Sequence, residues 1–314
     1  MIFVLTDIND NLFSVENAVS YELVREADAA CAGLRLYFDT DCALGEINSV
    51  LVKRDDGTLI FNGFCDVQRE SRSENGFEYF IYARSSAALL VDNEAVPAEY
   101  KNPTARQLFI NNAREFGFSC GLPDIGIENN YIVSKGTSCF GAVNDFVYMA
   151  AGTPVYADEN NVLRIYRESD EVKSLADYNI ISQSFTVNRS SVISRVDYKI
   201  NAEDDYKYHY ASMLAENNKI YRTRKINLSG LPLWQREEAA EKRISQSLDE
   251  YYTFRAVLAG SCDFKLYDRV KTDRGEFSVR EIIDTKNDKG ERTTLVMQRK
   301  IEGRTVNYVA EQKI

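Results

Sequence analysis

Short stretches in which apolar and polar positions alternate fill the first ninety residues of the chain. Phe77, Tyr79 and Ile81, for example, alternate with Glu78 and two further aromatic residues, which is the two-residue period of a β-strand. Turn signals such as the Asp-Asp-Gly at residues 55–57 separate these stretches. The pattern predicts six short strands, typical of a sandwich or barrel, at residues 1–7, 15–24, 33–39, 46–54, 58–70 and 77–84.

A spacing of three to four residues replaces this alternation between about residues 92 and 167. It predicts one helix over residues 104–116 and another over residues 138–151, each followed by a glycine that would end it. Ser138 is suited to cap the second helix, because its hydroxyl can accept from a free backbone N–H group. A hairpin with a polar turn is predicted to follow over residues 153–166.

Strand periodicity returns after a charged boundary at residues 168–179. One helix interrupts it, because residues 234–252 carry an apolar stripe beside Glu and Arg at helical spacing. Residues 274–299 are predicted to form a final hairpin with its turn at residues 287–290. The strands predicted in this part are residues 181–189, 192–200, 206–214, 219–228, 254–260, 264–273, 275–284 and 292–301.

Three local motifs connect the chain with a known family. The aromatic strand ends in Ala-Arg-Ser at residues 83–85, a Leu-Val-Asp-Asn segment follows at 90–93, and the next helix ends at a Phe-Gly pair at 116–117. This order resembles the hub family of bacteriophage baseplates, which includes the late control D and the Mu-like or PBSX-like tail hub proteins. The resemblance extends over most of the chain in the order and type of its elements.

Pattern and resemblance together predict a mainly β fold with an α+β insertion. Two barrel-like, tube-type β domains, residues 1–92 and 171–314, would flank a small α+β middle domain of residues 93–170. The second barrel would carry the one long helix. The resemblance also implies that the two barrels superpose on each other, although the sequence shows no visible repeat.

The function that this resemblance implies is structural. It suggests the baseplate or tail hub of a phage or phage-like contractile injection particle, with a homotrimeric ring that adapts the sixfold tail tube to the threefold central spike. The implied partners are the tail tube protein or tube initiator and the spike protein, with the tape-measure and baseplate wedge proteins as further candidates. Such a chain would be made in a bacterial cytoplasm and assembled into a virion or a tail-like bacteriocin.

The balance of charges is compatible with this hypothesis, although an acidic excess is also common among soluble bacterial proteins. The chain has 48 acidic and 38 basic residues and a formal net charge of −10, so it should repel phosphate and is not expected to bind nucleic acid specifically. In a conduit, such repulsion would let a polyanionic cargo slide. The many aromatic residues, on both faces of strands at residues 77–82 and 206–210, favour assembly into a ring because aromatics are enriched in interface cores.

No residues are spaced for catalysis or for metal binding. His209 is the single histidine, and it has Asp204 and Asp205 nearby but no evident nucleophile. The carboxylate pairs at residues 204–205 and 237–238 are interpreted as solvated. We therefore expect no enzyme activity, no catalytic residue, no cofactor and no metal site.

The six cysteines and one glycine-rich segment lead to the same expectation. The cysteines are scattered without a CxxC pair, so zinc is not expected and most of them are interpreted as buried small apolar residues. Residues 136–141 lack the Gly-Lys-Ser/Thr ending of a phosphate loop and are interpreted as the entry to a helix.

Two other functional classes stay open. One is a tail-associated, carboxylate-dependent hydrolase of cell-wall glycan, which would need two acids at a suitable separation. The other is a peripheral receptor-binding or carbohydrate-binding tail module. Membrane insertion is not expected, because no stretch approaches the ~20 apolar residues of a membrane span and the first residues do not resemble a signal peptide.

Overall fold

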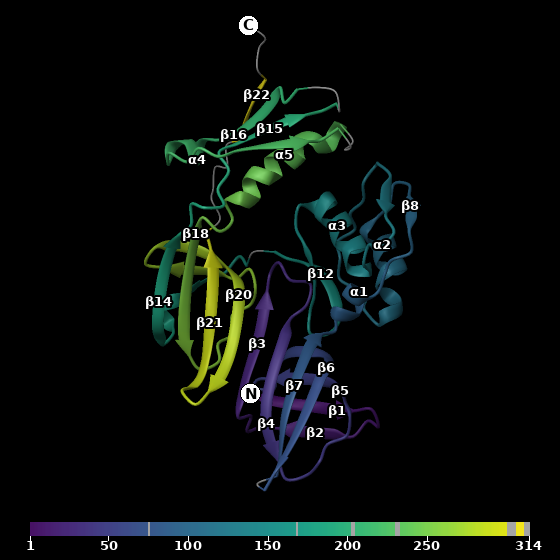
Figure 1. Ribbon diagram of the computed structural model, residues 1–314, viewed down its shortest axis with the longest axis vertical. Helices are drawn as coiled ribbons and strands as arrows, with labels where there is room; N and C mark the ends of the chain where they lie inside the picture. The colour runs from purple at the N-terminus through teal and green to yellow at the C-terminus, as the bar shows by residue number, and fades with distance from the viewer. Residues whose placement is uncertain (75, 168, 202–204, 230–232, 300–305, 311–314) are drawn as a thin grey trace.

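The computed structural model describes residues 1–74, 76–167, 169–201, 205–229, 233–299 and 306–310, without the side chains of 233–238 and 306–310 (Figure 1). Two curved barrel-like units lie side by side, a helical module lies next to them, and a smaller sheet with a long helix lies at the end opposite the first unit. This architecture confirms the predicted mainly β fold with barrel-like units and few helices.

The first barrel unit is formed by the first seven strands. Its core follows from strict alternation: Leu34, Leu36 and Phe38 of one strand are buried, whereas Arg35 and Tyr37 between them are exposed. Phe3, Leu5, Leu23 and Ile81 join them in one apolar cluster. The strands are β1 Ile2–Asp7, β2 Leu12–Val15, β3 Ser20–Glu26, β4 Gly33–Thr40, β5 Ile47–Lys53, β6 Leu59–Ser73 and β7 Gly76–Ser85.

The second barrel unit comes from two separated parts of the chain. Its core contains Phe254, Phe264, Phe277 and Leu295, all buried. The predicted last hairpin is confirmed, with Asn287 paired to Gly290 at its turn. The elements are β13 Val172–Ser174, η2 Leu175–Asp177, β14 Ile180–Val187, β18 Tyr252–Ala259, β19 Arg269–Thr272, β20 Gly275–Asn287 and β21 Gly290–Gln298.

One strand pair joins the two barrel units into a single sheet. β20 of the second unit pairs with β3 of the first in antiparallel register, so that Glu281 lies opposite Glu26 and Lys286 opposite Tyr21. We call this pair the seam. The strand order across the seam is β14-β18-β21-β20-β3-β4-β7-β6-β5-β1-β2, with β13 and β19 attached beside β20.

The helical module, residues 88–167, lies beside the first barrel unit (Figure 1). α2 and α3 pack on each other around Leu108, Phe109, Val143 and Phe146. Its elements are α1 Ala88–Asp92, β8 Ala98–Tyr100, α2 Ala105–Asn112, η1 Arg114–Phe116, β9 Ser119–Cys120, β10 Tyr131–Val133, α3 Cys139–Ala151, β11 Val155–Ala157 and β12 Val162–Ile165.

Local signals placed α3 correctly, whereas the helix predicted over residues 104–116 ends at Asn112 and is followed by the short 3₁₀ helix η1. The Ser138 hydroxyl accepts from the backbone N–H of Gly141 at 3.0 Å, which caps the start of α3 as predicted. Gly152 follows the end of α3 with φ of 69°, a left-handed conformation that glycine adopts without strain. The hairpin predicted over residues 153–166 is the β11–β12 pair.

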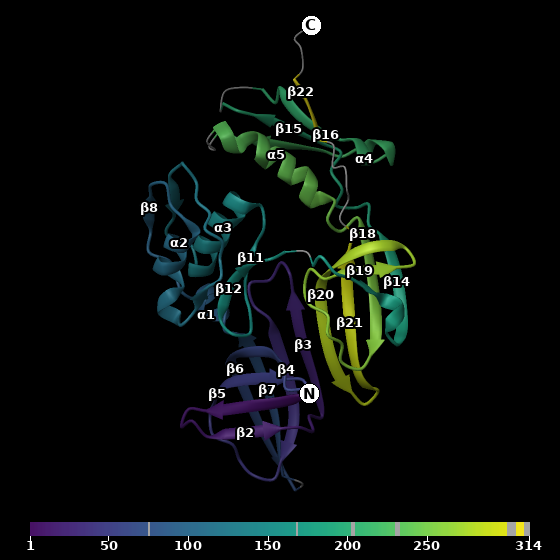
Figure 2. The same cartoon turned by 180° about the vertical axis from the view of Figure 1, so that it is seen from behind.

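The sheet–helix module is formed by the chain between β14 and β18 together with the later strand β22, and it contains a separate four-stranded sheet in the order β17-β15-β16-β22. Helix α5 packs on β15 and β16 through Ala240 and Ile244 (Figures 1 and 2). Its elements are β15 Arg195–Lys199, β16 Tyr208–Ser212, α4 Met213–Asn217, β17 Thr223–Asn227, α5 Leu233–Ser247 and β22 Val306–Ala310.

Two predicted elements in this module differ from the structure. The strand predicted over residues 206–214 ends at Ser212, whose hydroxyl accepts from the Ala215 N–H and so starts the short helix α4. The helix predicted over 234–252 ends at Ser247, and residues 252–259 already form β18. We keep 1–92, 93–170 and 171–314 as proposed domains, with the sheet–helix module nested in the third.

The helices of the described residues include none that is both long and apolar enough to span a membrane.

Candidate functional site

His209 lies on β16, opposite Asp197 of β15. Its ring is partly buried, and its Nδ1 has no hydrogen-bond partner in the structure. Asp205 is exposed, whereas Asp204 and the side chains of Glu237 and Glu238 lie outside what the structure describes. Among the described residues, no three His, Cys, Asp or Glu side chains come together as metal ligands would.

The cysteines correct one interpretation of the sequence. All six are free, and Cys139 and Cys262 are the ones that are buried. The prediction that most of them are buried is therefore wrong. Cys42 is exposed because it follows β4 in a turn, and Cys65 is only half-buried at an irregularity of the β6–β7 ladder.

A buried charged network lies in the seam. The Asp284 side chain is fully buried and forms an ion pair with Arg25 across the two barrel units. Thr293 donates a second hydrogen bond to this carboxylate at 2.7 Å. Because a buried carboxylate is stable only when it is paired and hydrogen-bonded, this network ties the register of β20 to that of β3.

The outer face of the seam places two acids opposite each other. Glu281 and Glu26 are direct partners in the ladder. Burial, and next the charge of Glu26, raise the pKa of the Glu281 carboxyl group, while Arg255 acts in the opposite direction. Like charges at directly opposite positions destabilise a sheet, so the seam is stabilised on its inner face and weakened on its outer one.

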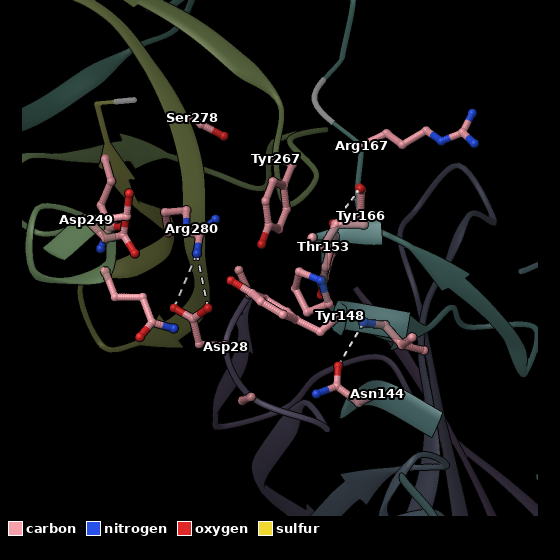
Figure 3. Close-up of a pocket in the computed structure, with 18 of the residues that line it drawn as sticks. Asp28, Asn144, Tyr148, Thr153, Tyr166, Arg167, Asp249, Tyr267, Ser278 and Arg280 are labelled. Atoms are coloured by element: carbon pink, nitrogen blue, oxygen red, sulfur yellow. Dashed lines mark hydrogen bonds and ion pairs between the residues drawn. The ribbon is translucent and has the colours of Figure 1, made fainter. Parts of the chain in front are cut away.

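A stack of rings connects the helical module to the second barrel unit (Figure 3). Tyr156 stacks on Tyr166 with ring centroids 4.2 Å apart, and Tyr166 stacks on Tyr267 at 4.3 Å. The guanidinium of Arg280 lies over the far side of Tyr267, 4.6 Å from its centroid. Arg280 also forms an ion pair with Asp28 at 3.1 Å, which adds the first barrel unit to the junction.

The backbone of Tyr267 is strained at this point. Its φ is 68°, in the left-handed region that a bulky side chain rarely adopts and that costs roughly 1–2 kcal/mol. The Tyr267 N–H nevertheless donates to the Val279 carbonyl at 2.8 Å. Strain of this kind concentrates at functional sites, which makes the junction the candidate functional site of the chain.

A cavity of about 700 Å³ opens at this junction. All four modules supply its wall: the β3–β4 loop, α3 and the following hairpin, α5, and the strands β20 and β21 (Figure 3). A second cavity, of about 470 Å³, shares Ala29, Ala30, Tyr166 and Arg167 with the first one. This site could not be predicted from the sequence, because its residues are far apart in the chain and follow no motif.

The aromatic second face of β7 is partly covered within the chain. Phe80 lies 4.7 Å from Tyr37, and Arg69 lies over its other side. Arg35 lies over Tyr82 in the same way. Tyr37 is nevertheless 46% exposed, and surface patches that are rich in tyrosine and arginine are typical of protein interfaces.

A free strand edge is the other prominent surface. β14 is the last strand of the large sheet, with a neighbour, β18, on one side only among the described strands. Nearly all of its residues are exposed, including the apolar Ile180, Ile181 and Val187. Such an edge offers unpaired backbone groups and apolar side chains to another chain.

The fold is similar to that of solved tail proteins. The prophage MuSo2 43 kDa tail protein from Shewanella oneidensis has a TM-score of 0.76 and 14% identity, covering 95% of this chain and 97% of its own. A tail protein from Neisseria meningitidis has a TM-score of 0.75 and 15% identity, covering 96% and 97%. At these identities the similarity shows a shared fold.

A third solved structure comes from a secretion system. The Escherichia coli c3393 protein is described as a component of the type VI secretion system, similar to the T4 bacteriophage tail proteins gp27 and gp5. Its TM-score is 0.61 at 11% identity, and the match covers 94% of this chain and 76% of that one. The sequence matches no protein family model, and no curated protein sequence matches it.

Proposed function

We propose that the chain is a structural hub protein of the baseplate of a phage or phage-like tail. The observation that carries this proposal is the seam, which joins two barrel-like units of one chain into one continuous curved sheet. The similarity of the fold to tail proteins along nearly the full length of both chains supports it. The chain then has a geometric rather than a chemical role.

The proposed assembly is a homotrimeric ring. Three chains with two barrel-like units each present six similar units, which is the number needed to continue a sixfold tube while seating a threefold spike. Closed cyclic assemblies reuse the same pair of surfaces at every interface. We assign the β14 edge as one of the two surfaces through which neighbouring chains meet.

The proposed partners follow from that position. A tail tube protein or tube initiator would stack on one side of the ring and a central spike protein on the other. Tape-measure and baseplate wedge proteins are further candidates, and the particle is a virion or a tail-like bacteriocin. Within this class we assign the chain to the late control D, Mu-like and PBSX-like hub proteins, on the sequence motifs at residues 83–85, 90–93 and 116–117.

The decisive experiment is the mass and shape of the purified chain. Light scattering after gel filtration, with and without the spike protein, should give three times the mass of 35.8 kDa, and negative-stain images should show a ring with a central hole. A monomer at every concentration, with the spike present, contradicts the proposal.

A matched pair of variants tests the assigned edge. Ile181→Lys puts a charge on the β14 edge, where the side chain is 48% exposed, and should shift the trimer toward monomer. Ile132→Lys changes an exposed isoleucine on β10 of the helical module and should leave the trimer intact. Equal effects of both variants would remove β14 from the interface.

The two alternative classes lack a comparable observation. Glu281 has a raised pKa and Glu26 opposite it, but Glu281 lines neither cavity. We therefore propose that the chain is not a cell-wall hydrolase. Zymography on cell walls tests this proposal. A cleared zone that is lost in the Glu281→Gln variant would favour the hydrolase. Binding of the isolated chain to cells would favour a receptor-binding or carbohydrate-binding module.

A further inference from the structure

We propose that the cavity at the junction is a binding site for a carboxylate carried by a ligand with an apolar or aromatic body. The site is independent of the ring, since it lies within one chain. Its volume of about 700 Å³ falls in the range of ordinary ligand pockets. Its wall also combines aromatic surface with a small number of polar groups, as such pockets do.

Two polar atoms of the cavity wall have no hydrogen-bond partner among the residues that the structure describes. Ser278 is only 8% exposed, and its Oγ accepts and donates no hydrogen bond. The Nε of Arg280 is buried and equally unpaired. Both residues line the same cavity (Figure 3), and buried polar groups without partners are rare in folded proteins because they lose hydration without compensation.

Strand β20 supplies both of these groups. Ser278 and Arg280 lie two positions apart on β20, and both line the cavity. The register between β20 and β21 shifts between Val279 and Glu281, which leaves Arg280 out of the ladder. Bulges of this kind redirect side chains and are over-represented next to functional sites.

The donors match a carboxylate. The Arg280 Nη2 already donates to the Asp28 carboxylate, at 3.1 and 3.4 Å, so the Nε–H remains for another acceptor. The Ser278 hydroxyl can donate to the second oxygen of the same group. Hydrogen bonds between a guanidinium and a carboxylate are the strong, charge-assisted type.

The charge and shape of the wall agree with this ligand class. Four basic residues and two acidic ones line the cavity, in a chain with a net charge of −10. The rings of Tyr148, Tyr166 and Tyr267 line the cavity, and because the stack occupies the faces of Tyr166 and Tyr267, these two rings offer their edges to a ligand. The basic residues are Arg167, Lys242, Arg280 and Arg299, and the acidic ones are Asp28 and Asp249.

The test uses the full chain and a matched pair of probes. N-acetyl-phenylalanine carries a carboxylate and an aromatic ring, and its amide has the same shape without the charge. Saturation-transfer NMR and calorimetry should show that the acid binds and that salt weakens its binding. The amide should not bind at concentrations up to about 10 mM, so that only very weak binding would escape detection. Equal binding of acid and amide, or no binding of either, overturns the proposal.

Variants assign the binding to this wall. Ser278→Ala and Arg280→Lys should each weaken binding of the acid about tenfold or more, because each removes a donor to a charged group. Asp28→Asn should strengthen it, because a competing carboxylate on Arg280 is neutralised. The controls Ser182→Ala and Arg255→Lys change exposed residues outside the cavity and should bind as the parent chain does.

The outcomes distinguish a loss of binding at the cavity from a loss of folding. If Arg280→Lys lowers the melting temperature strongly, the fold-neutral Ser278→Ala decides, and unchanged affinity in that variant overturns the proposal. A peptide that ends in phenylalanine with a free terminal carboxylate distinguishes two sources. Binding at least about tenfold tighter than N-acetyl-phenylalanine assigns the site to the end of a partner chain, and equal binding assigns it to a small organic acid.

Discussion

Tyr166 and Tyr267 stack with ring centroids 4.3 Å apart, although they belong to the helical module and the second barrel unit. The stack continues through Arg280 to Asp28 of the first barrel unit. Aromatic pairs in this arrangement contribute about 0.5–1.5 kcal/mol beyond the area that they bury. The Tyr267 ring, in a strained backbone, therefore contributes to the placement of the helical module against the two barrel units, which the seam already joins.

Two replacements of Tyr267 distinguish the contribution of its ring to stability from the cost of its backbone conformation. Tyr267→Ala and Tyr267→Gly both remove the ring and should both lower the free energy of unfolding. Because φ at this position is 68°, the glycine variant should be the more stable of the two by about 1 kcal/mol. Denaturant unfolding of both variants measures the difference.

Tyr221→Ala serves as the control, since Tyr221 is 79% exposed and should be replaceable with little effect. If the alanine variant of Tyr267 equals or exceeds the glycine variant in stability, the backbone at Tyr267 is not strained in solution.

The buried ion pair of the seam gives a second prediction. Asp284→Ala leaves Arg25 with a charge beside an empty space and should lower the free energy of unfolding by about 3–5 kcal/mol. The double variant Arg25→Met, Asp284→Leu replaces the pair with apolar side chains and should recover most of that loss, because neither charge stays buried.

Chemical denaturation of the parent chain and both variants provides the measurement. If the double variant is as unstable as Asp284→Ala, the ion pair stabilises the fold by more than the mutual neutralisation of its two charges. Asp288→Ala, in the exposed turn of the same hairpin, should change stability by less than about 0.5 kcal/mol.

The local elements were predictable because their signals lie within a few residues. Ser138 and Gly152 mark both ends of α3, and Asn287 to Gly290 form the turn of the last hairpin. The seam was not predictable, because Glu26 and Glu281 are far apart in the chain and their strands resemble their neighbours in composition.

The candidate site was out of reach for the same reason. Ser278 and Arg280 lie in a stretch whose alternation predicts only a strand, and the register shift that turns Arg280 toward the cavity has no signal in the sequence. Tyr267 sits inside a stretch predicted as a strand, whereas its left-handed backbone belongs to the turn before β19. These side chains line a cavity only because the modules of the chain pack against one another.

Stability should depend on pH through Glu281. Its pKa is raised in the folded state, so the folded chain holds the proton more tightly than the unfolded one. The resulting stabilisation is fully present below the ordinary pKa of glutamate and is lost as the pH rises through the raised value. Glu281→Gln, which is never charged, should therefore be more stable than the parent chain at pH 7, by about 0.2–1 kcal/mol.

The advantage of Glu281→Gln should vanish near pH 4, where the parent carboxyl group is also neutral. Unfolding curves between pH 4 and pH 8 test this dependence. Glu128→Gln changes an exposed glutamate of the helical module and should show no such trend. A constant difference between Glu281→Gln and the parent at every pH would mean that the charge of Glu281 does not oppose folding.

The last prediction concerns the wall of the proposed channel. The acids Glu22, Glu26 and Glu281 share the outer face of the joined sheet, because Tyr21 and Leu23, on either side of Glu22, point into the core. We expect this face to contribute to a channel wall that is neutral or negative. The assembled chain should then not bind a short DNA duplex even at low salt. Affinity for DNA comes largely from Lys and Arg contacts to phosphate, and this face does not supply enough of them.

Charge reversal gives the contrast. The triple variant Glu22→Lys, Glu26→Lys, Glu281→Lys should bind the duplex with an affinity that falls steeply as salt is added. The triple variant Glu128→Lys, Glu171→Lys, Glu216→Lys makes the same change in net charge at exposed positions outside the joined sheet, and it should bind more weakly. Fluorescence anisotropy at several salt concentrations compares the two. Because net charge is matched, a difference between them reports the position of the charges, whereas duplex binding by the parent chain would mean that its acidic excess does not keep polyanions from the wall.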